Sequence, residues 1–376
     1  MNLIYAKKFR FPDNSANMIQ GVNMVAAFSH HNINTNAFFS FNDTINDRNS
    51  FLKDCYGINF SRQSNKIHFT SQKLRGLNYN LWLIKNIINK KNVVLYTREG
   101  TEASRSIFLK HLKVPAVPLF HEVHKFDFNI TGNSNIENKL RKKISKLFSQ
   151  ITGLIFIDEL LAKQTKDVLN IQTPIYIAPS GVNLTTFSCC NYSIPTSKII
   201  LGYFGQLIPE KGLLLLLQAF GKLPEHYHLR LIGQCNEQMR NNFSEIARTA
   251  ASRIQFMGYV DHASLPHAMQ GVHISVIPSI MKNQFLSPLK LAESLAMGMP
   301  IVCTPMPHLQ HILTSEKNAV FAHEATPEGL AAAIRRLGDF PQRLIAMQQE
   351  NRNYAEKFSW ESRAQGIIHF MQEVKS

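Results

Sequence analysis

The chain has 376 residues, of which 44% are hydrophobic and 18% are charged, and its formal net charge is +15 at pH 7. This length exceeds what one ordinary core holds and suits two domains of roughly 180 residues each. The composition excludes a disordered chain, and no apolar run reaches the roughly 18 residues that a membrane-spanning helix needs.

The N-terminus and the cysteines predict a cytoplasmic protein. Residues 1–10 start with an apolar, strand-like segment and then turn basic, the reverse of the order in a secretory signal peptide. The five cysteines are odd in number and form no C-x-x-C pair, which disfavours a disulfide framework and a structural zinc site. No other metal-binding cluster is visible in the sequence, and we expect no metal and no other cofactor.

Most of the positive charge lies in the first half of the chain. Residues 1–200 contain 25 Lys and Arg against 12 Asp and Glu, whereas residues 201–376 contain 16 against 14. A basic half suggests an anionic partner such as a phospholipid, a pyrophosphate lipid or a nucleic acid. A surface kept solvated by Lys and Arg explains the same numbers, so the charge alone does not choose between these interpretations.

Short apolar strands alternate with longer helical patterns along the whole chain. Several of these strands lack the alternation of a half-exposed strand, so both faces of their sheets should be covered by helices. The expected strands of the first half are Leu3–Ala6, Ala37–Phe41, Val93–Thr97, Ala116–Phe120, Leu154–Ile157 and Ile175–Ala178. Those of the second half are Ile199–Phe204, Leu229–Ile232, Ile254–Met257, Ile274–Pro278, Ile301–Thr304 and Ala319–Ala322. Two such series predict an α/β protein with two doubly wound, Rossmann-like parallel-sheet domains.

Loop-forming residues at Cys189–Lys198 mark the boundary between the two series. We expect an N-terminal domain over residues 1–190, a C-terminal domain over 198–355, and a C-terminal helix over 356–376 that packs back on the N-terminal domain. Ligands of such sheets bind beyond the carboxyl ends of the strands, so two facing sheets would enclose a cleft.

Residues 136–151 predict an amphipathic helix whose polar side is strongly basic. Its apolar stripe includes Ile136, Leu140 and Ile144, and five Lys or Arg residues crowd the remaining surface. A solvated surface helix is one interpretation. The other is attachment to an anionic membrane, peripherally on the inner face of the plasma membrane.

A short, well-delimited helix follows the strand Ile274–Pro278. Ser287 is suited to cap its N-terminus, Pro288 suits the first helical position, and Gly298 is a natural stop. Lys290 in the first turn opposes the helix dipole, a conflict that a phosphate bound at the helix N-terminus would remove. Glu293 falls on the same face, where its carboxylate could accept hydrogen bonds from sugar hydroxyls, although a simple surface Lys–Glu pair has the same spacing.

A second candidate phosphate element is the segment Gly205–Gly212. A strand ends at Gly205, whose lack of a side chain lets a ligand approach the backbone, and Lys211 stands just before a helical run. Two such elements in one sheet predict a diphosphate site.

Together these elements resemble family 4 of the retaining glycosyltransferases, which have the GT-B fold. The resemblance extends over almost the whole chain, and its motifs stand in the family's order. The matching pieces are Ser15 to Gln20, Tyr96 to Arg98, Phe120 to His124, Pro179 to Asn183 with Phe187, Gly205 to Gly212, Phe256 to Val260, Ser287 to Val302, and Phe358 to Trp360.

The resemblance implies roles on the donor side. Lys211 matches the lysine that holds the donor diphosphate, and Glu293 matches a glutamate that contacts ribose. Backbone amides near Leu289 and Lys290 would hold the distal phosphate. The loop Gly258-Tyr259-Val260 is similar to the one that contacts the nucleobase through its backbone.

Two positions depart from the family pattern. The glutamate that usually touches the transferred sugar is Phe285 here, and the arginine that usually binds phosphate is Gln206. We expect Lys290 to supply the missing positive charge. The identity of the sugar stays open.

On the acceptor side, the resemblance points to Ser15, Asn17, Arg98, Glu122 and His124. Glu122 and His124 are expected to follow the strand Ala116–Phe120, and His124 corresponds to a histidine near the transferred sugar. Arg98 either positions an anionic acceptor or supports its loop. His121 is a weaker candidate, and Asp158 is interpreted first as a helix N-cap and only second as an acceptor contact.

The implied reaction moves a sugar from a UDP- or GDP-sugar to a hydroxyl of a saccharide or lipid-linked acceptor, with retention of configuration and without a metal. His124, Lys211 and Glu293 are the residues expected to act in it, in bacterial surface polysaccharide or lipopolysaccharide synthesis. Three alternatives remain, namely a catalytically weakened GT-B partner of another transferase, a basic nucleic-acid-binding protein, and a sugar-nucleotide epimerase.

Overall fold

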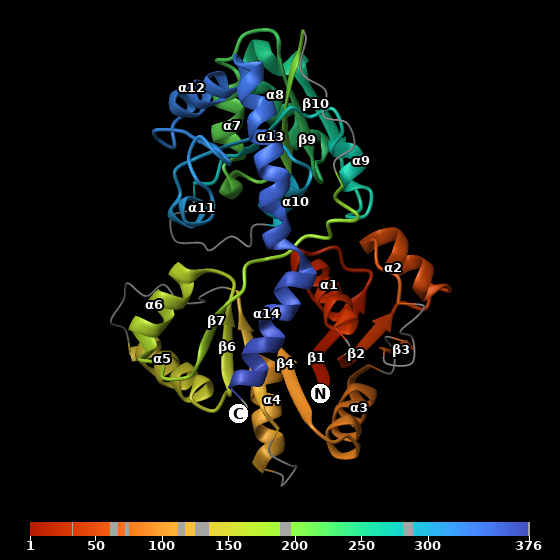
Figure 1. Ribbon diagram of the computed structural model, residues 1–376. Coiled ribbons are helices and arrows are strands. Elements are labelled where there is room, and N and C mark those ends of the chain that lie inside the picture. Colours follow the sequence, from red (N-terminus) through yellow and green to blue (C-terminus); the bar gives the residue numbers. More distant parts are fainter. Residues whose placement is uncertain are drawn as a thin grey trace. The chain divides into compact units, whose positions relative to one another are not determined.

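The computed structural model describes residues 1–31, 33–60, 67–71, 75–111, 117–124, 135–188, 197–280 and 289–374. Contacts divide the chain into two compact units, one formed by Met1–Gly181 with Trp360–Ser376 and the other by Val182–Ser359 (Figure 1). The sequence suggested changes of domain at 189–198 and at 356, whereas the units change at Gly181–Val182 and at Ser359–Trp360. Where the chain passes from one unit to the other, the Val182 amide donates to the carbonyl oxygen of Phe358 at 2.7 Å.

The first unit is built on a seven-stranded parallel sheet in the order β3-β2-β1-β4-β5-β6-β7. Its strands are β1 (Asn2–Phe11), β2 (Asn34–Phe41), β3 (Ile67–Ser71), β4 (Val93–Thr97), β5 (Leu119–Val123), β6 (Gly153–Phe156) and β7 (Ile175–Ile177). Every residue of β4 is buried, as expected for a strand with a covered sheet face on each side. The strand order reverses between β1 and β4, and ligands of doubly wound sheets bind beside such a reversal.

Seven helices accompany this sheet in the described part of the first unit. They are α1 (Ala16–His30), α2 (Arg48–Tyr56), α3 (Arg75–Asn89), α4 (Gly100–His111), α5 (Asn135–Phe148), α6 (Glu159–Leu169) and α14 (Trp360–Glu373). Although α14 is the last helix of the chain, it packs beside α1 (Figure 1). Its Phe370 ring lies 5.8 Å from the Phe120 ring and 5.5 Å from the Tyr176 ring. These contacts fix α14 over the strands β5 and β7.

The second unit is built on a six-stranded parallel sheet in the order β10-β9-β8-β11-β12-β13. Its strands are β8 (Ile199–Phe204), β9 (Tyr227–Ile232), β10 (Ile254–Gly258), β11 (Ile274–Ile277), β12 (Ile301–Cys303) and β13 (Val320–Phe321). Its helices are α7 (Leu213–Phe220), α8 (Glu237–Ala247), α9 (Leu265–Met269), α10 (Leu289–Ala296), α11 (Pro307–Ile312), α12 (Pro327–Gly338) and α13 (Pro341–Ala355), with 3-10 turns η3 (Pro209–Lys211), η4 (Arg248–Arg253) and η5 (Glu356–Phe358). Two separate apolar clusters, one around Leu216 and Leu231 and one around Leu291 and Ile301, form its core. The prediction of two doubly wound parallel-sheet domains is confirmed.

The structure corrects two details of the first sheet. The strand β3 was missed, because its Ile67-His-Phe-Thr-Ser71 segment is short and mixes polar with apolar residues. The strand expected at Ala116–Phe120 is β5, which begins at Leu119, after Pro118, whose ring nitrogen has no hydrogen to donate to a neighbouring strand. Glu122 therefore lies inside the strand rather than after it, and only His124 follows its end.

Two backbone segments of the second unit approach closely because glycine is present. Gly212 follows η3 in the left-handed region at φ 81°, and a Cβ there would lie 1.6 Å from the Pro278 carbonyl oxygen. This contact holds the loop after β8 against the loop after β11, the two loops at the strand reversal of this sheet. Within the described residues, none of the helices is long and apolar enough to cross a membrane.

We predict that Gly212→Ala lowers the free energy of unfolding of the second unit by roughly 3 kcal/mol or more, because it adds a backbone clash to conformational strain. Gly271→Ala is the matched control, since Gly271 also has a left-handed φ, 73°, but no atom within 4 Å of an added Cβ. Its cost should be roughly 1 kcal/mol. Urea unfolding measures both values, and equal costs for the two variants would contradict the prediction.

Candidate functional site

The candidate donor site begins at the end of β8, where the backbone turns at Gly205. Gly205 has a φ of 122°, and its amide donates to the Ile232 carbonyl oxygen at 2.9 Å. The adjacent Gly233 lies directly against it, since a Cβ at Gly233 would come within 2.0 Å of the Gly205 carbonyl oxygen. The next residue, Gln206, is exposed, and its carbonyl oxygen accepts from the Tyr203 hydroxyl at 2.9 Å.

Lys290 reaches from the first turn of α10 back to this glycine. Its ammonium lies 4.4 Å from the centroid of the Tyr203 ring, a cation–π contact, and would be 3.9 Å from a Cβ at Gly205. Burial, and then repulsion from Lys211, lowers the pKa of Lys290 to about 8. The side chain is therefore a partly desolvated cation held over an aromatic face.

Lys211 is the last residue of η3, so it stands immediately before Gly212 and α7. Burial lowers its pKa as well, and its positive charge acts on Lys290. Among the described residues, neither lysine forms an ion pair with a carboxylate. Glu293 attracts Lys290 and Glu210 attracts Lys211 from beyond ion-pair distance. Two neighbouring, partly desolvated cations without a paired carboxylate form a favourable place for an anion.

Glu293 has a different partner from the one its spacing suggested. Its carboxylate is 7% exposed, and the Nε2 atom of His262 lies 2.9 Å from its Oε1 atom. The His262 ring itself packs 5.1 Å from the ring of Phe187. Within the described residues Glu293 thus forms no pair with Lys290, and the alternative of a solvated surface Lys–Glu pair does not hold.

The last residue of β10, Gly258, contacts Gly233 at the start of the loop after β9. The Gly258 carbonyl oxygen accepts from the Gly233 amide at 2.9 Å, and the space around the Gly258 α-carbon is open. Tyr259 is 50% exposed and its hydroxyl donates to Asp261 at 3.0 Å, while Val260 packs against the core. Ser287, Pro288 and Phe285 lie outside the described residues, whereas Leu289 and Lys290 form the first turn of α10.

The acceptor-side residues of the first unit surround a buried carboxylate. The Glu122 side chain is 1% exposed, and its Oε1 atom lies 2.8 Å from a terminal nitrogen of Arg363 and 3.6 Å from Nε of Arg98. The Tyr96 hydroxyl donates to its Oε2 atom, and the His124 ring contacts Oε1 through Nε2. The two guanidinium groups hold the pKa of Glu122 well below its usual range, against the opposing effect of burial.

Arg98 is committed to the protein interior. Its side chain is 2% exposed, and it donates to the Gln20 side chain and, at 3.2 Å, to the Asn17 carbonyl oxygen. Gln20 in turn donates to the Ser180 hydroxyl at 2.6 Å. Of the two roles expected for Arg98, these contacts favour support of its loop. They leave the side chain almost no exposed surface with which to bind an anionic acceptor.

His124 is the one member of this cluster with an accessible edge, since its side chain is 20% exposed. Burial, followed by the charge of Arg98, lowers its pKa to about 4. The ring is therefore neutral near pH 7. Arg98 lies close to both ring nitrogens, with its Nε atom 3.0 Å from Nε2 and a terminal nitrogen 3.2 Å from Nδ1, while Nε2 also contacts the Glu122 carboxylate. In the tautomer with the hydrogen on Nε2, the ring donates to Glu122 and Nδ1 accepts from Arg98.

Several sequence candidates have structural roles. The Ser15 hydroxyl caps α1 by accepting from the Met18 amide at 3.3 Å, while Asn17 is exposed and contributes its backbone oxygen to Arg98. Asp158 caps α6, as its first interpretation predicted, by accepting from the Leu161 amide at 3.0 Å. His121 is buried inside β5, and burial lowers its pKa to about 4.

Four residues of these clusters were not predicted from the sequence, namely Tyr203, His262, Gln20 in its bridging role, and Arg363. Arg363 lies 241 residues from Glu122 in the chain. The only local signal was an arginine on the apolar side of the last helix, among Trp360, Ala364 and Ile367.

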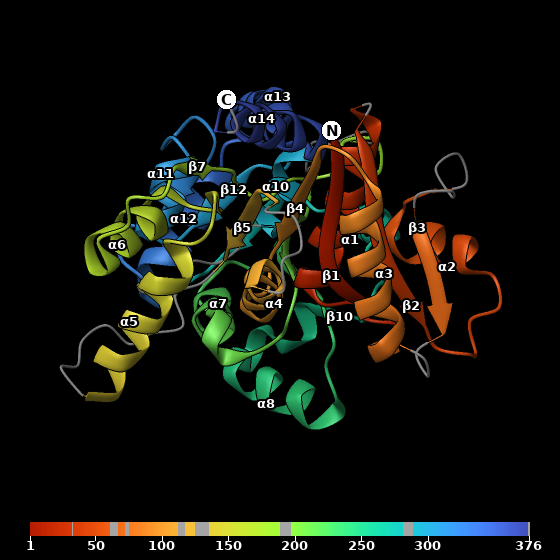
Figure 2. The same cartoon turned by 90° about the horizontal axis from the view of Figure 1, so that it is seen from below.

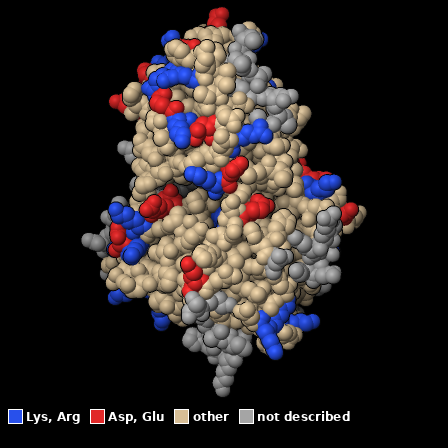
Figure 3. All heavy atoms as spheres, in the orientation of Figure 1, with Lys and Arg blue, Asp and Glu red and all other residues tan. Residues whose placement is uncertain are grey.

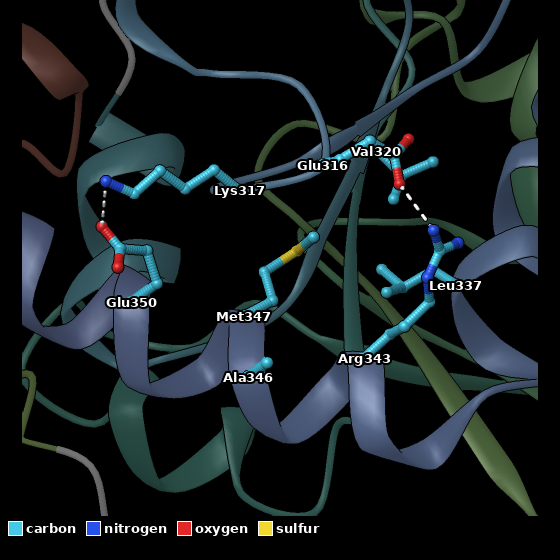
Figure 4. A pocket seen from close by; sticks show the side chains of 8 residues that line it. All are labelled: Glu316, Lys317, Val320, Leu337, Arg343, Ala346, Met347 and Glu350. Atoms are coloured by element: carbon cyan, nitrogen blue, oxygen red, sulfur yellow. Dashed lines mark ion pairs between the residues drawn. The ribbon is translucent and has the colours of Figure 1, made fainter.

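Two further hollows lie away from these clusters. One, of about 250 Å³, is lined by Val320, Met347 and the ion pairs Lys317–Glu350 and Glu316–Arg343 (Figure 4). Because these charges are paired with each other, none is left for a ligand. In the described ranges, no group of three or more His, Cys, Asp or Glu side chains is placed to hold a metal ion.

The second hollow is a groove of about 480 Å³ between α5 and α6, which lie side by side in Figure 2. Arg141, Lys142 and Lys146 line it together with two serines, and no acidic side chain is among the lining residues. On the face shown in Figure 3, most of the surface belongs to residues other than Lys, Arg, Asp and Glu, and several Lys and Arg side chains lie beside Asp and Glu.

Comparisons with known proteins agree with this arrangement. Residues 198–339, which cover most of the second unit, match the model of the family described as Glycosyl transferases group 1. The uncharacterized glycosyltransferase MJ1607 of Methanocaldococcus jannaschii is 25% identical over 175 residues, or 46% of this chain and 44% of that protein. The putative teichuronic acid biosynthesis glycosyltransferase TuaH of Bacillus subtilis is 25% identical over 193 residues, or 47% of this chain and 48% of that protein. The match thus spans about half the length of these relatives.

The fold is that of GT-B glycosyltransferases. The crystal structure of Anabaena HepE in complex with UDP has a TM-score of 0.74 and 12% sequence identity, with 99% of this chain and 100% of that chain covered. The GT-B prediction is therefore confirmed for the fold.

We predict that inorganic pyrophosphate binds at Lys211 and Lys290, and that its affinity falls between about pH 7 and pH 9 as Lys290 loses its proton. At pH 7, Lys290→Met should bind pyrophosphate roughly tenfold more weakly than the wild type. Because deprotonation of Lys290 removes the same cation, this difference between the two proteins should shrink as the pH rises. Isothermal titration calorimetry measures both. Lys317→Met, which removes a lysine paired with Glu350, is the control. Equal affinities for wild type and Lys290→Met at pH 7 would rule out the lysine site.

Proposed function

We propose that this protein is a retaining glycosyltransferase that moves a sugar from a nucleoside-diphosphate sugar to a hydroxyl group of a saccharide or lipid-linked acceptor. The observation that carries the proposal is the pair of neighbouring cations Lys211 and Lys290, of which Lys290 lies beside Gly205 and neither forms an ion pair with a carboxylate among the described residues. This pair lies within the segment that matches the Glycosyl transferases group 1 model.

On the donor side, the two lysines would hold the diphosphate, with the amides of Leu289 and Lys290 at the start of α10. Ser287 and Pro288 are proposed to complete that helix start. Gly205 and Gln206 would let the phosphates approach the backbone, and Lys290 takes the place of the arginine that Gln206 replaces. UDP is the first donor nucleotide to test, since HepE was crystallised with UDP.

The nucleoside would extend from the lysines toward Glu293 and the loop after β10. Glu293 is proposed to bind ribose hydroxyls, oriented by its 2.9 Å contact with His262. Gly258, Tyr259 and Val260 would contact the base. The open space around the Gly258 α-carbon supports a close approach of a ligand to this backbone.

In the reaction, the leaving diphosphate gains negative charge as the sugar–oxygen bond breaks. Lys211 and Lys290 would stabilise that charge in a partly desolvated setting, where it interacts more strongly than in water. We therefore propose that the transfer needs no metal. Retention of configuration follows from the family resemblance, with the sugar attacked on the face from which the diphosphate leaves.

On the acceptor side, the proposal assigns substrate contact to His124, with Asn17 and Ser15 as exposed neighbours in the same unit. A neutral imidazole can exchange hydrogen bonds with sugar hydroxyls but is a weak base with a pKa of about 4. His124 would thus orient a sugar, and Glu122 and Arg98 would act through it. Surface polysaccharide or lipopolysaccharide synthesis is the proposed setting, supported by the name of TuaH.

Purified protein should bind a UDP- or GDP-sugar and transfer or hydrolyse the sugar equally well with and without EDTA. Lys211→Ala should weaken donor binding by roughly 10- to 100-fold, since it removes a charge-assisted contact to the diphosphate. Lys222→Ala is the control, because Lys222 pairs with Glu328 at 2.9 Å. Calorimetry and product analysis measure these effects.

Other outcomes of this screen would contradict the proposal in distinct ways. Donor binding without turnover would indicate a weakened partner of another transferase. A changed sugar on an intact nucleotide would indicate an epimerase. Salt-sensitive oligonucleotide binding without sugar-nucleotide binding would indicate a nucleic-acid-binding protein. Loss of transfer in EDTA, restored by Mg²⁺ or Mn²⁺, would contradict metal independence.

The groove between α5 and α6 supports a second proposal, that the first unit attaches to an anionic membrane surface. Its lining residues Arg141, Lys142 and Lys146 concentrate three positive charges on one helix. Basic amphipathic helices of this kind bind anionic headgroups, at about 1 kcal/mol for each cation near the surface. Such attachment would bring the protein to a lipid-linked acceptor.

Vesicles containing phosphatidylglycerol should therefore bind the protein at low salt, and changing Arg141, Lys142 and Lys146 together to Gln should weaken binding by roughly 100-fold. Changing Lys53, Lys85 and Lys91 to Gln removes the same charge from exposed positions away from α5 and α6. Co-sedimentation measures both variants. Equal losses would show that net charge, rather than the groove, governs binding.

A further inference from the structure

Arg363 stands on the last helix, α14, yet its side chain is buried at the acceptor-side cluster. The side chain is 4% exposed, and one terminal nitrogen lies 2.8 Å from the Glu122 Oε1 atom while the other lies 3.5 Å from Oε2. Its Nε donates to the Pro179 carbonyl oxygen at 2.8 Å. The guanidinium therefore joins α14, β5 and the loop after β7.

The contacts of Arg363 close a ring around the end of the sheet. Glu122 contacts Arg98, Arg98 donates to Gln20, and Gln20 donates to Ser180, which is the next residue after Pro179. Five segments of the first unit, α1, the loop after β4, β5, the loop after β7 and α14, are thus linked through charged or polar side chains. A ring of this kind has few free rotations left for any member.

His124 receives its orientation from this ring. The imidazole contacts Glu122 through Nε2, and Arg98 nitrogens lie 3.0 Å from Nε2 and 3.2 Å from Nδ1. The contact with Glu122 requires that its carboxylate stay ionised and in place, and Arg98 and Arg363 favour that state.

We propose that Arg363 is a positioning residue for the acceptor side of the proposed transfer reaction, acting through Glu122 on the ring of His124. The proposal rests on the proposed function, in which His124 contacts the reacting sugar. Arg363 itself touches no substrate. The last helix is then part of the site's supporting framework and not only a cover for the sheet.

The experiment compares Arg363→Met and Arg363→Lys with Phe370→Ala. Phe370 is also buried on α14, where it contacts Phe120 and Tyr176, so its loss loosens the same helix without touching Glu122. Each variant is assayed for kcat and acceptor KM well below its unfolding temperature. Donor binding is measured on each as a check on the second unit.

Arg363→Met should lower kcat/KM for the acceptor by roughly 100-fold, because displacing a group at the reaction site by about 1 Å can reduce the rate by this factor. Arg363→Lys, which keeps the charge but not the paired geometry, should lose roughly tenfold. Phe370→Ala should keep kcat/KM near the wild-type value, and donor affinity should be unchanged in all three.

The titration of His124, followed by the NMR signal of its ring and assigned with His124→Gln, gives a readout that does not need activity. Arg98, Glu122 and Arg363 are the charged groups that act on this ring. Removing Arg363 removes a positive charge that disfavours protonation, so the titration midpoint should rise from about 4. In Phe370→Ala it should stay where it is in the wild type.

Two failures can be told apart. If the wild type transfers sugar and Arg363→Met matches Phe370→Ala in kcat/KM and in the His124 titration, the positioning role is overturned. If the wild type neither binds nor turns over any sugar nucleotide, the proposed function fails, and an unshifted His124 titration in Arg363→Met would overturn the structural link as well.

Discussion

The carboxylate of Glu122 is the constraint on which the functional edge of the first unit depends. A charged group with 1% exposure loses most of its hydration, which costs several kcal/mol unless hydrogen bonds and opposite charges replace the water. Arg98, Arg363 and the Tyr96 hydroxyl supply that replacement from three different segments. Once these groups converge, the end of β4, the end of β5 and the last helix have a single arrangement relative to one another.

The second unit solves a different electrostatic problem. In the described residues of its candidate site, Lys211 and Lys290 are brought together by close backbone approaches at Gly212 and Gly233, and no carboxylate joins them. Glu293, the nearest candidate, is instead held by His262. The charges around Glu122 are satisfied inside the protein, whereas Lys211 and Lys290 form no ion pair within the described residues. This contrast supports a diphosphate at one site and an uncharged hydroxyl at the other.

Much of the fold could be predicted from the sequence, because apolar strands with helices on both sheet faces leave a strong local pattern. Local rules also predicted the cap at Asp158. The position of Glu122 within β5 depended on where Pro118 lets the strand begin, so the expected strand ended too early. Arg363 and His262 could not be predicted, since their partners lie 241 and 31 residues away and only the tertiary structure brings them together. Ser287 and Pro288 lie outside the described residues, and their roles stay predictions.

The fate of Arg98 narrows what the proposed acceptor site can recognise. Sequence alone left two roles open for this arginine, binding an anionic acceptor or supporting its loop. Its side chain is 2% exposed, its donors are directed to His124, Gln20 and Asn17, and it forms an ion pair with Glu122. An acceptor would therefore meet the edge of a neutral His124 and the exposed Asn17 side chain rather than a guanidinium. Groups of this kind exchange hydrogen bonds with hydroxyls, so the acceptor that suits this edge is a sugar presenting an uncharged hydroxyl, with any anionic lipid portion bound elsewhere.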